Sequence, residues 1–459
     1  MNADALVIFG ATGDLARKKI FPALQALVKR GALTSKIIGV ARPGFSLEQL
    51  RQRAKESVTE HGGLDPVAFP KLAELLQFVD GEYGQPATFE KLRSALGTAK
   101  LPVHYLAIPP SMFGTVVANL GRAGCAENAR VIVEKPFGRD RASAHGLNQA
   151  LLSVFPEPAI FRIDHYLGKE PVQNLSYFRF SNTFIEPILN RTYVQSVQIT
   201  MAEKIGIEGR GRLYEETGAI RDVIQNHMLQ LVASVAMDAP TSRELEAVRD
   251  EKARLFRAIR PCSPEDVVRG QFRGYRSEQD VAPKSTVETF AAMRLHIDNW
   301  RWAGVPFYVR AGKALPTSVS EVLVQLKTPP YSVYGESLCD ADSRTNYIRF
   351  RLSPDVAIAQ GVRVKVPGEA MRGDEVELVA TQQPNDHLDA YARLLGDAIK
   401  GDATLFARED SVEAQWRVVE PILGDASALY EYDQGTWGPA EADRLTDWAD
   451  PSVARKPAG

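Results

Sequence analysis

Ionisable side chains gather in one short stretch, 162–170, which reads RIDHYLGKE. Asp164, His165, Tyr166 and Lys169 all lie within it. If its latter part is helical, His165 and Lys169 stand one turn apart on one face. Two cations so placed could hold a dianionic phosphate, with the Tyr166 hydroxyl as a further donor. A solvated surface cluster of charges is the alternative interpretation.

A second group that could do chemistry is His227, in a predicted helix over 217–237. Histidine is the natural base for taking a hydroxyl proton near neutral pH, and it needs a carboxylate to orient it. Asp222 and Asn226 share one helical face, whereas His227 lies about 140° round from Asp222 in an α-helix. A pocket would have to open between them for both to act. A lone helical histidine is more often structural, so its position alone does not decide its role.

A nucleotide site is predicted near the start of the chain. Residues 10–16 read GATGDLA and follow a short apolar run. Glycines at such a junction permit a tight turn and let a pyrophosphate approach the following helix. The spacing differs from GxGxxG, so an ordinary strand-to-helix turn is the alternative. The candidate cofactor residues here are Gly10, Ala11, Thr12, Gly13, Asp14 and Leu15.

Arg42 adds a hint about which dinucleotide would bind. It follows a second apolar run, where dinucleotide folds usually place an acid on the ribose hydroxyls. A cation at that position favours the 2′-phosphate of NADP instead. A solvated loop arginine is the competing interpretation.

These candidates need a scaffold, and the apolar pattern predicts two kinds. Apolar runs at 5–9, 36–41, 103–108 and 130–135 are separated by helical stretches, which is typical of a parallel α/β sheet. After about residue 175, four longer segments alternate in the manner of half-buried strands, at 194–204, 288–298, 322–327 and 346–354. With helices expected at 217–237 and 387–400, this second part is predicted to be α+β around a broad, mostly antiparallel sheet. The tail after Gly435 is expected to be loosely attached.

Length and composition narrow the class of protein. A chain of 459 residues suits two domains, and 55 Lys plus Arg against 57 Asp plus Glu give no overall field for nucleic acid or a membrane. The three cysteines lie far apart, and no histidine pair has metal-ligand spacing. We therefore expect no disulfide framework, no metal site and a cytoplasmic setting. The first residues show no signal peptide.

Taken together, these segments resemble the glucose-6-phosphate dehydrogenase family in order along nearly the whole chain. The likeness includes GATGDLA, GVAR, EKPFG (134–138) and RIDHYLGKE. It continues through NRTYVQSVQITMAEKIGIEGRGRLYEETGAIRDVIQNHMLQ and IDNWRWAGVPFYVRAGKALP, then DAYARLLGDAIKGDATLF and GTWGP.

The resemblance implies a Rossmann-like NADP-binding domain over 1–172 and a substrate-binding and dimerisation domain over 173–459. The implied reaction is oxidation of glucose 6-phosphate at carbon 1, with NADP as cofactor, by a homodimer or homotetramer. His227 matches the family's base and Asp164 the aspartate that orients it. The positions that match the substrate site are Lys135, His165, Tyr166, Lys169, Glu203, Asp222 and Lys313, with Lys135 near both ligands. A cis bond between Lys135 and Pro136 is also implied.

The chain departs from the family pattern in two places. Beyond Lys313 the family often carries a second basic residue about five positions on, but Ser318 stands there. The 269–290 stretch also looks shortened in its loop. The first change could weaken phosphate binding or alter substrate preference. A dehydrogenase of another sugar phosphate or with another hydride acceptor, and a catalytically silent relative, are the alternatives.

Overall fold

The computed structural model describes residues 2–331, 333–334, 346–368, 370–381 and 388–452. The chain divides into two compact units. The first unit comprises Met1–Glu170, Pro240–Asp250 and Asp386–Glu413, and the second comprises Pro171–Ala239, Glu251–Asn385 and Ala414–Gly459. Among the described residues, we find no helix with the length and apolar character that crossing a membrane requires.

The first unit is built on a six-stranded sheet in the order β3-β2-β1-β4-β5-β6, and every neighbouring pair is parallel. The strand order reverses between β1 and β4, which is where such sheets bind nucleotides. The parallel sheet predicted from the sequence is confirmed, and two of the four predicted runs match their strands to the residue. The strands are β1 Ala5–Phe9, β2 Lys36–Ala41, β3 Leu76–Asp80, β4 Pro102–Leu106, β5 Arg130–Glu134 and β6 Ile160–Ile163.

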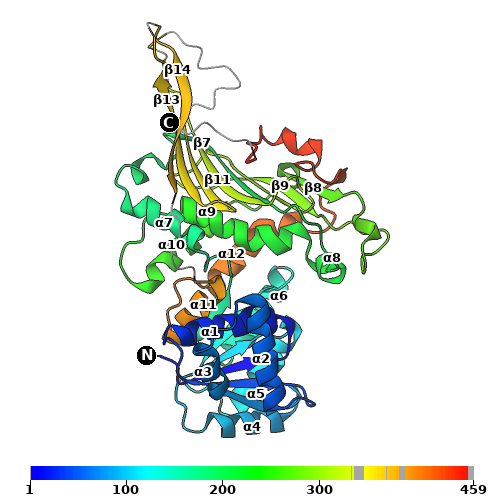
Figure 1. Ribbon diagram of the computed structural model, residues 1–459. Helices are drawn as coiled ribbons and strands as arrows, with labels where there is room; N and C mark the ends of the chain where they lie inside the picture. Colours follow the sequence, from blue (N-terminus) through cyan, green and yellow to red (C-terminus); the bar gives the residue numbers. More distant parts are fainter. Residues whose placement is uncertain (1, 332, 335–345, 369, 382–387, 453–459) are drawn as a thin grey trace. The chain divides into compact units, whose positions relative to one another are not determined.

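Helices cover this sheet and complete its core (Figure 1). The helices in chain order are α1 Phe21–Lys29, α2 Leu47–His61, α3 Ala68–Leu75, α4 Pro86–Leu96, α5 Phe113–Arg122 and α6 Arg141–Leu152. A late helix, α11 Ala390–Lys400, joins them, because its buried Leu394, Leu395 and Ala398 belong to the same core cluster as Leu6 of β1. The order of elements along the chain does not predict that α11 packs on the first unit. Only the apolar face of the helix specifies the core that it joins.

The second unit contains a nine-stranded sheet in the order β14-β13-β12-β11-β7-β10-β9-β8-β15. Only the β7–β10 and β8–β15 pairs are parallel, so the predicted mostly antiparallel sheet is confirmed for the described chain. The strands are β7 Val194–Ala202, β8 Val267–Phe272, β9 Phe290–Leu295, β10 Phe307–Gly312, β11 Val319–Leu326, β12 Tyr347–Ser353, β13 Ala357–Lys365, β14 Gly373–Thr381 and β15 Leu429–Tyr432.

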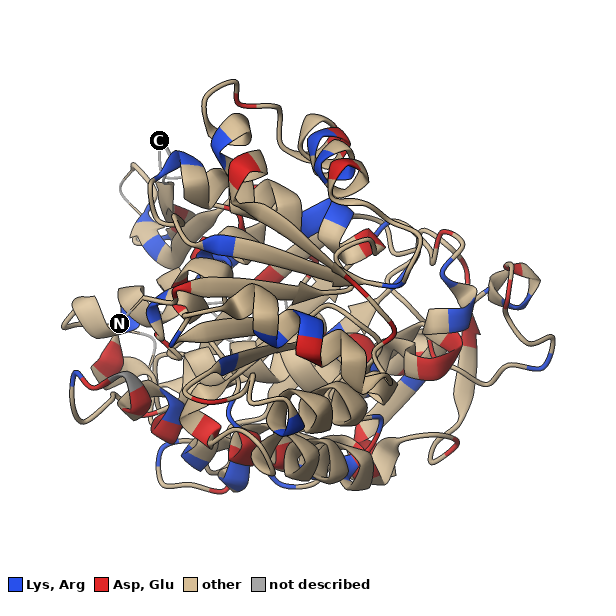
Figure 2. Cartoon of the chain, turned by 90° about the horizontal axis from the view of Figure 1, so that it is seen from below, with Lys and Arg blue, Asp and Glu red and all other residues tan. Residues whose placement is uncertain are grey.

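Helices of the second unit lie along one face of this sheet (Figure 1). The main helices are α7 Glu170–Ser181, α8 Gly211–Ala219, α9 Leu229–Ala236, α10 Leu245–Ala258 and α12 Glu409–Val419. Both α10 and α12 begin within segments of the first unit and continue into the second. Basic and acidic residues are interspersed over the helices and loops (Figure 2).

The loop between β8 and β9, within the 269–290 stretch, is bound to α8 through the carboxylate of Glu215. Glu215 of α8 accepts hydrogen bonds from the hydroxyls of Tyr275 and Ser285, at 2.7 and 2.6 Å. At the start of α8, a Cβ on Gly211 would lie 2.0 Å from the carbonyl oxygen of Gln279. The loop is therefore held closely against the helix.

The expectation of a loosely attached tail is wrong for residues 436–452. The Arg310 guanidinium lies 4.6 Å from the ring centre of Trp437 and 4.7 Å from that of Trp448, and it donates to the Ala449 carbonyl at 2.7 Å. Ala442 and Ala449 are buried. The composition of the tail, rich in Ala, Pro and Asp, does not indicate these contacts. Two aromatic rings around one buried cation are enough to anchor a short segment.

We expect Trp448→Ala to lower the thermal unfolding midpoint, with a loss of about 2 kcal/mol, because it removes ring packing and the stacking on Arg310. Differential scanning calorimetry would measure the change. Trp300→Ala is the matched control, since Trp300 is 89% exposed. Equal midpoints for the two variants would show that the tail does not contribute to stability.

Candidate active site

The loop after β1 requires glycine at its first position. Gly10 has φ +80°, and a Cβ there would lie 2.1 Å from the carbonyl oxygen of Ala107, which follows β4. The Gly13 amide donates to the Gly10 carbonyl at 2.9 Å, which closes the turn. Helical structure begins directly afterwards at Asp14 and passes through a π-helical turn, Ala16–Ile20, into α1.

These residues fit a dinucleotide. Two of the four turn residues, Gly10 and Gly13, have no side chain at the switch point of the sheet, and the helix that follows presents its N-terminus there. Arg42 directly follows β2 with its side chain 73% exposed, and its Nε lies 3.9 Å from Glu82 Oε2. A cation so exposed is available to a phosphate group.

A buried carboxyl group lies beside Lys135 at the end of β5. Glu134 Oε1 accepts from the Tyr105 hydroxyl at 2.5 Å. Burial raises the pKa of Glu134 to about 7, although the Tyr105 hydrogen bond and the Lys135 charge oppose this. The Lys135–Pro136 bond is cis, as the resemblance implies. Sequence analysis did not single out Glu134, because a glutamate at a strand end carries no sign of its burial.

The phosphate candidates lie on consecutive turns and not on a helix. The amides of Leu167, Gly168 and Lys169 donate to the carbonyls of Asp164, His165 and Tyr166, each three residues earlier, and α7 begins only at Glu170. The conditional expectation of one helical face for His165 and Lys169 is therefore wrong. The Asp164 side chain accepts from the Tyr166 amide at 3.0 Å and so draws this segment into a turn.

Tyr391 of α11 supports this turn. Its ring stacks on that of His165, with centres 6.2 Å apart and planes 12° apart. Within the turn segment, Lys169 Nζ lies 3.8 Å from the centre of the Tyr166 ring. Sequence reasoning missed Tyr391, because it lies more than 200 positions away and only the packing of α11 on the first unit brings it there.

His227 occupies a π-helix, Ile220–Met228, between α8 and α9. In a π-helix the repeating backbone hydrogen bond joins residues five apart, so Asp222 and His227 lie one above the other on the same side of the helix. The angle of about 140° calculated for an α-helix is therefore wrong here. Asn226 takes part in the irregular turn: its Nδ2 donates to the Arg221 carbonyl at 3.0 Å, and its Oδ1 accepts from the His227 amide at 2.6 Å. His227 is buried.

Lys313 and Glu203 form an ion pair within the second unit. Lys313 Nζ lies 2.6 Å from Glu203 Oε2, and the lysine side chain is buried whereas the glutamate is 43% exposed. The Tyr432 hydroxyl donates to the Lys313 carbonyl at 2.7 Å, which fixes the lysine backbone. Ser318 accepts from the Lys204 amide at 3.0 Å. Its hydroxyl thus has a local structural role and supplies no charge.

Comparison with known proteins places both parts of the chain in one family. The model "Glucose-6-phosphate dehydrogenase, NAD binding domain" matches residues 7–174, and "Glucose-6-phosphate dehydrogenase, C-terminal domain" matches residues 176–451. The chain belongs to the glucose-6-phosphate dehydrogenase family. The resemblance and the fold predicted from the sequence are thereby confirmed.

Individual members of this family agree over their full length. "Glucose-6-phosphate 1-dehydrogenase 1" of Mycobacterium tuberculosis (strain ATCC 25618 / H37Rv) is 40% identical over 99% of this chain and 97% of its own. The crystal structure of glucose-6-phosphate 1-dehydrogenase from Mycobacterium avium has a TM-score of 0.92 and 42% identity, covering 99% of this chain and 100% of its own. A glucose-6-phosphate dehydrogenase in complex with its substrate glucose 6-phosphate has a TM-score of 0.90 and 34% identity, covering 98% of this chain and 100% of its own.

The raised pKa of Glu134 predicts a pH-dependent cost to folding. Between about pH 4.5 and 7 the folded carboxyl holds its proton while the unfolded one releases it, so stability falls as pH rises. Glu134→Gln removes this titration. We therefore expect the difference in unfolding free energy, variant minus wild type, to increase by up to about 3 kcal/mol between pH 4.5 and 8.

Urea unfolding at several pH values would measure the difference, with exposed Glu127→Gln as the control. A constant difference between Glu134→Gln and the wild type across this range would contradict the assignment.

Proposed function

We propose that this chain oxidises glucose 6-phosphate at carbon 1 to 6-phospho-D-glucono-1,5-lactone and reduces NADP, the first step of the oxidative pentose phosphate pathway. Family membership over the whole chain carries the proposal. The side chains that this reaction needs are all retained: a histidine base, a carboxylate to orient it, and cations for a phosphate.

The substrate phosphate is proposed to bind at the turn after β6. His165 and Lys169 supply positive charge, and Tyr166 supplies a hydroxyl donor. A turn tied by three successive backbone hydrogen bonds and stacked on Tyr391 holds these groups with little freedom. A dianion is bound most strongly by donors that need no reordering. Lys135 is proposed to reach the substrate from the end of β5.

Recognition of the sugar is assigned to the second unit. Glu203 and Asp222 offer carboxylate oxygens that accept hydrogen bonds from sugar hydroxyls. The Lys313 ammonium pairs with Glu203 and so directs its carboxylate group. Because Ser318 supplies no charge, the cationic contribution of this region rests on Lys313.

His227 is proposed to take the proton of the 1-hydroxyl, as the electron pair of that O–H bond forms the new carbonyl. Asp164 orients the imidazole and stabilises its charged form. Asp222, five positions before His227 in the π-helix, fixes the sugar relative to the base. His227 is buried, so few water molecules compete with the 1-hydroxyl for hydrogen bonds to its imidazole.

The residues Gly10, Ala11, Thr12, Gly13, Asp14, Leu15, Arg42 and Lys135 would hold NADP. When bound, the nicotinamide supplies the acceptor for the hydride that leaves carbon 1. Gly10 lets the main chain pass close to the pyrophosphate, and the helix N-terminus favours its negative charge. Arg42 pairs with the 2′-phosphate.

We also propose the division of labour implied by the resemblance, with cofactor binding in 1–172 and substrate binding and dimerisation in 173–459, except that Lys135 and the phosphate turn at 164–169 lie in the first range. Exposed apolar residues on the β13–β14 hairpin and the turn that joins its strands, among them Val364, Met371, Leu378 and Val379, support assembly into a homodimer or homotetramer. The buried, free thiols of Cys125 and Cys262 suit a cytoplasmic location.

Steady-state kinetics with glucose 6-phosphate and NADP tests the function. We expect the wild type to form NADPH, and His227→Asn to lower kcat by about three orders of magnitude or more with a similar KM, since it removes an interaction of the transition state. His61→Asn is the matched control, because this histidine lies at the end of α2 and should leave kcat unchanged.

Two results would count against the proposal. If the wild type forms no NADPH from glucose 6-phosphate but does so from another sugar phosphate, the substrate assignment is wrong, as the absence of a cation at Ser318 allows. If His227→Asn retains a normal kcat, another residue is the base.

A further inference from the structure

The strand that leads to Asp164 and His165 lies at an edge of its sheet. In the described chain, β6 pairs along its length only with β5. On its open side a single bridge joins it to the returning segment, where the Ala407 amide donates to the Arg162 carbonyl at 3.1 Å. An edge strand with one bridge has few backbone restraints, so side chains must fix its end.

The Arg162 side chain supplies such restraint. It is fully buried, and its guanidinium makes a two-fold contact with Glu157, at 2.7 and 3.0 Å. Its Nε donates to Asn148 Oδ1 of α6 at 3.1 Å. A buried cation is tolerated only with such complete pairing, and two parallel bonds fix its direction as well as its distance.

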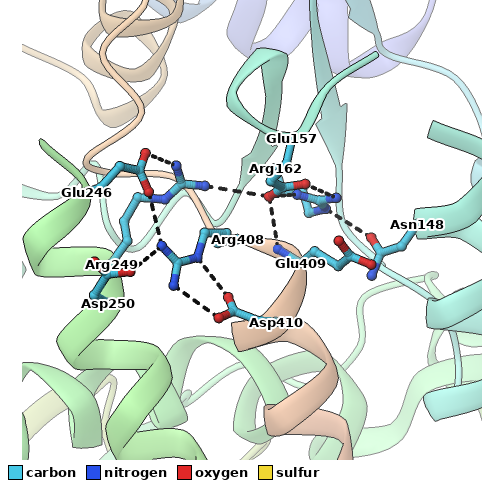
Figure 3. A network of polar contacts seen from close by, with 9 residues as sticks. All are labelled: Asn148, Glu157, Arg162, Glu246, Arg249, Asp250, Arg408, Glu409 and Asp410. Atoms are coloured by element: carbon cyan, nitrogen blue, oxygen red, sulfur yellow. Dashed lines mark hydrogen bonds and ion pairs between the residues drawn. The ribbon is translucent and has the colours of Figure 1, made fainter. Parts of the chain in front are cut away.

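From Glu157 the contacts continue to Arg249, Glu246 and Arg408 (Figure 3), and the backbone bridge between Ala407 and Arg162 closes them into a ring. Glu157 lies 3.7 Å from Arg249, which donates to Glu246 at 2.7 Å. Glu246 in turn accepts from Arg408 at 3.1 Å. Because Arg408 follows Ala407 in the chain, the ring returns to the carbonyl of Arg162 itself.

Further bonds stiffen the ring where it meets the two helices. Arg408 makes a two-fold contact with Asp410, at 2.8 and 3.0 Å, and donates to Asp250 at 2.6 Å. The Glu409 amide donates to Glu157 at 3.0 Å. The starts of α10 and α12 are thus tied to the same carboxylates as β6, all within the first unit.

We propose that Arg162 is a positioning residue for the reaction: through this ring it holds the end of β6, and with it Asp164 and His165, in working geometry. The inference rests on the proposed function. Asp164 lies two residues beyond Arg162, so a shift of the strand end moves the carboxylate directly. A displacement of about 1 Å in an orienting group can lower the rate about 100-fold.

Arg162→Met tests the proposal, because it keeps much of the side-chain volume and removes the charge. We expect kcat to fall about 10- to 100-fold, while KM for NADP stays within about two-fold, since residues 10–15 and 42 follow other strands. The acidic limb of kcat/KM against pH should move to lower pH, because the charged base loses its aligned carboxylate. Arg162→Lys should give an intermediate kcat.

Arg130→Gln is the matched control. Arg130 also binds the returning segment, donating to the carbonyls of Ala398 and Ile399 at 3.1 and 2.8 Å, but it lies at the start of β5. We expect it to lower stability without moving the pH limb.

If Arg162→Met does not fold, Arg408→Met opens the ring at a partly exposed residue and should move kcat and the limb in the same direction. A folded Arg162→Met or Arg408→Met with normal kcat and pH profile overturns the proposal, as does an equal shift in Arg130→Gln. An inactive wild type would refute the proposed function instead.

Discussion

A buried charge must be paired, and this constraint shapes parts of the proposed active site and the strand that leads to it. Lys313 has Glu203, Arg162 has Glu157, and the carboxyl of Glu134 has the Tyr105 hydroxyl. Each pair offsets the cost of removing a charge or a polar group from water. Each pair also fixes the orientation of its two side chains. The same pairing that makes burial tolerable also orders the groups that would bind and react with substrate.

A second constraint, on backbone geometry, applies in the first unit. A pyrophosphate can approach the main chain most closely at a glycine, and the Ala107 carbonyl after β4 leaves no room for a Cβ at Gly10. The π-helix around His227 is the counterpart in the second unit, since it changes which residues share a side. In both places a departure from regular geometry coincides with a proposed functional group.

The sequence predicts much of this architecture, because continuous apolar runs and alternating runs distinguish the two sheets. Apolar spacing cannot show that α11 returns to the first unit, that the tail wraps around Arg310, or that Tyr391 stacks on His165. Each of these depends on contacts between residues far apart in the chain. The turn at 164–169 and the π-helix were missed for a local reason, since α-helical periodicity was assumed where side-chain bonds from Asp164 and Asn226 favour other turns. The roles of the site residues stay predictions.

The central claim is that His227 is the base, and the pH dependence of kcat/KM for glucose 6-phosphate tests it most directly. The account predicts that the acidic limb of the wild type includes ionisation of the base, and that His227→Asn has a low rate and keeps only the ionisation of the substrate phosphate, whose second pKa is about 6. If His227→Asn shows the same acidic limb as the wild type, a different group accepts the proton and the account is contradicted.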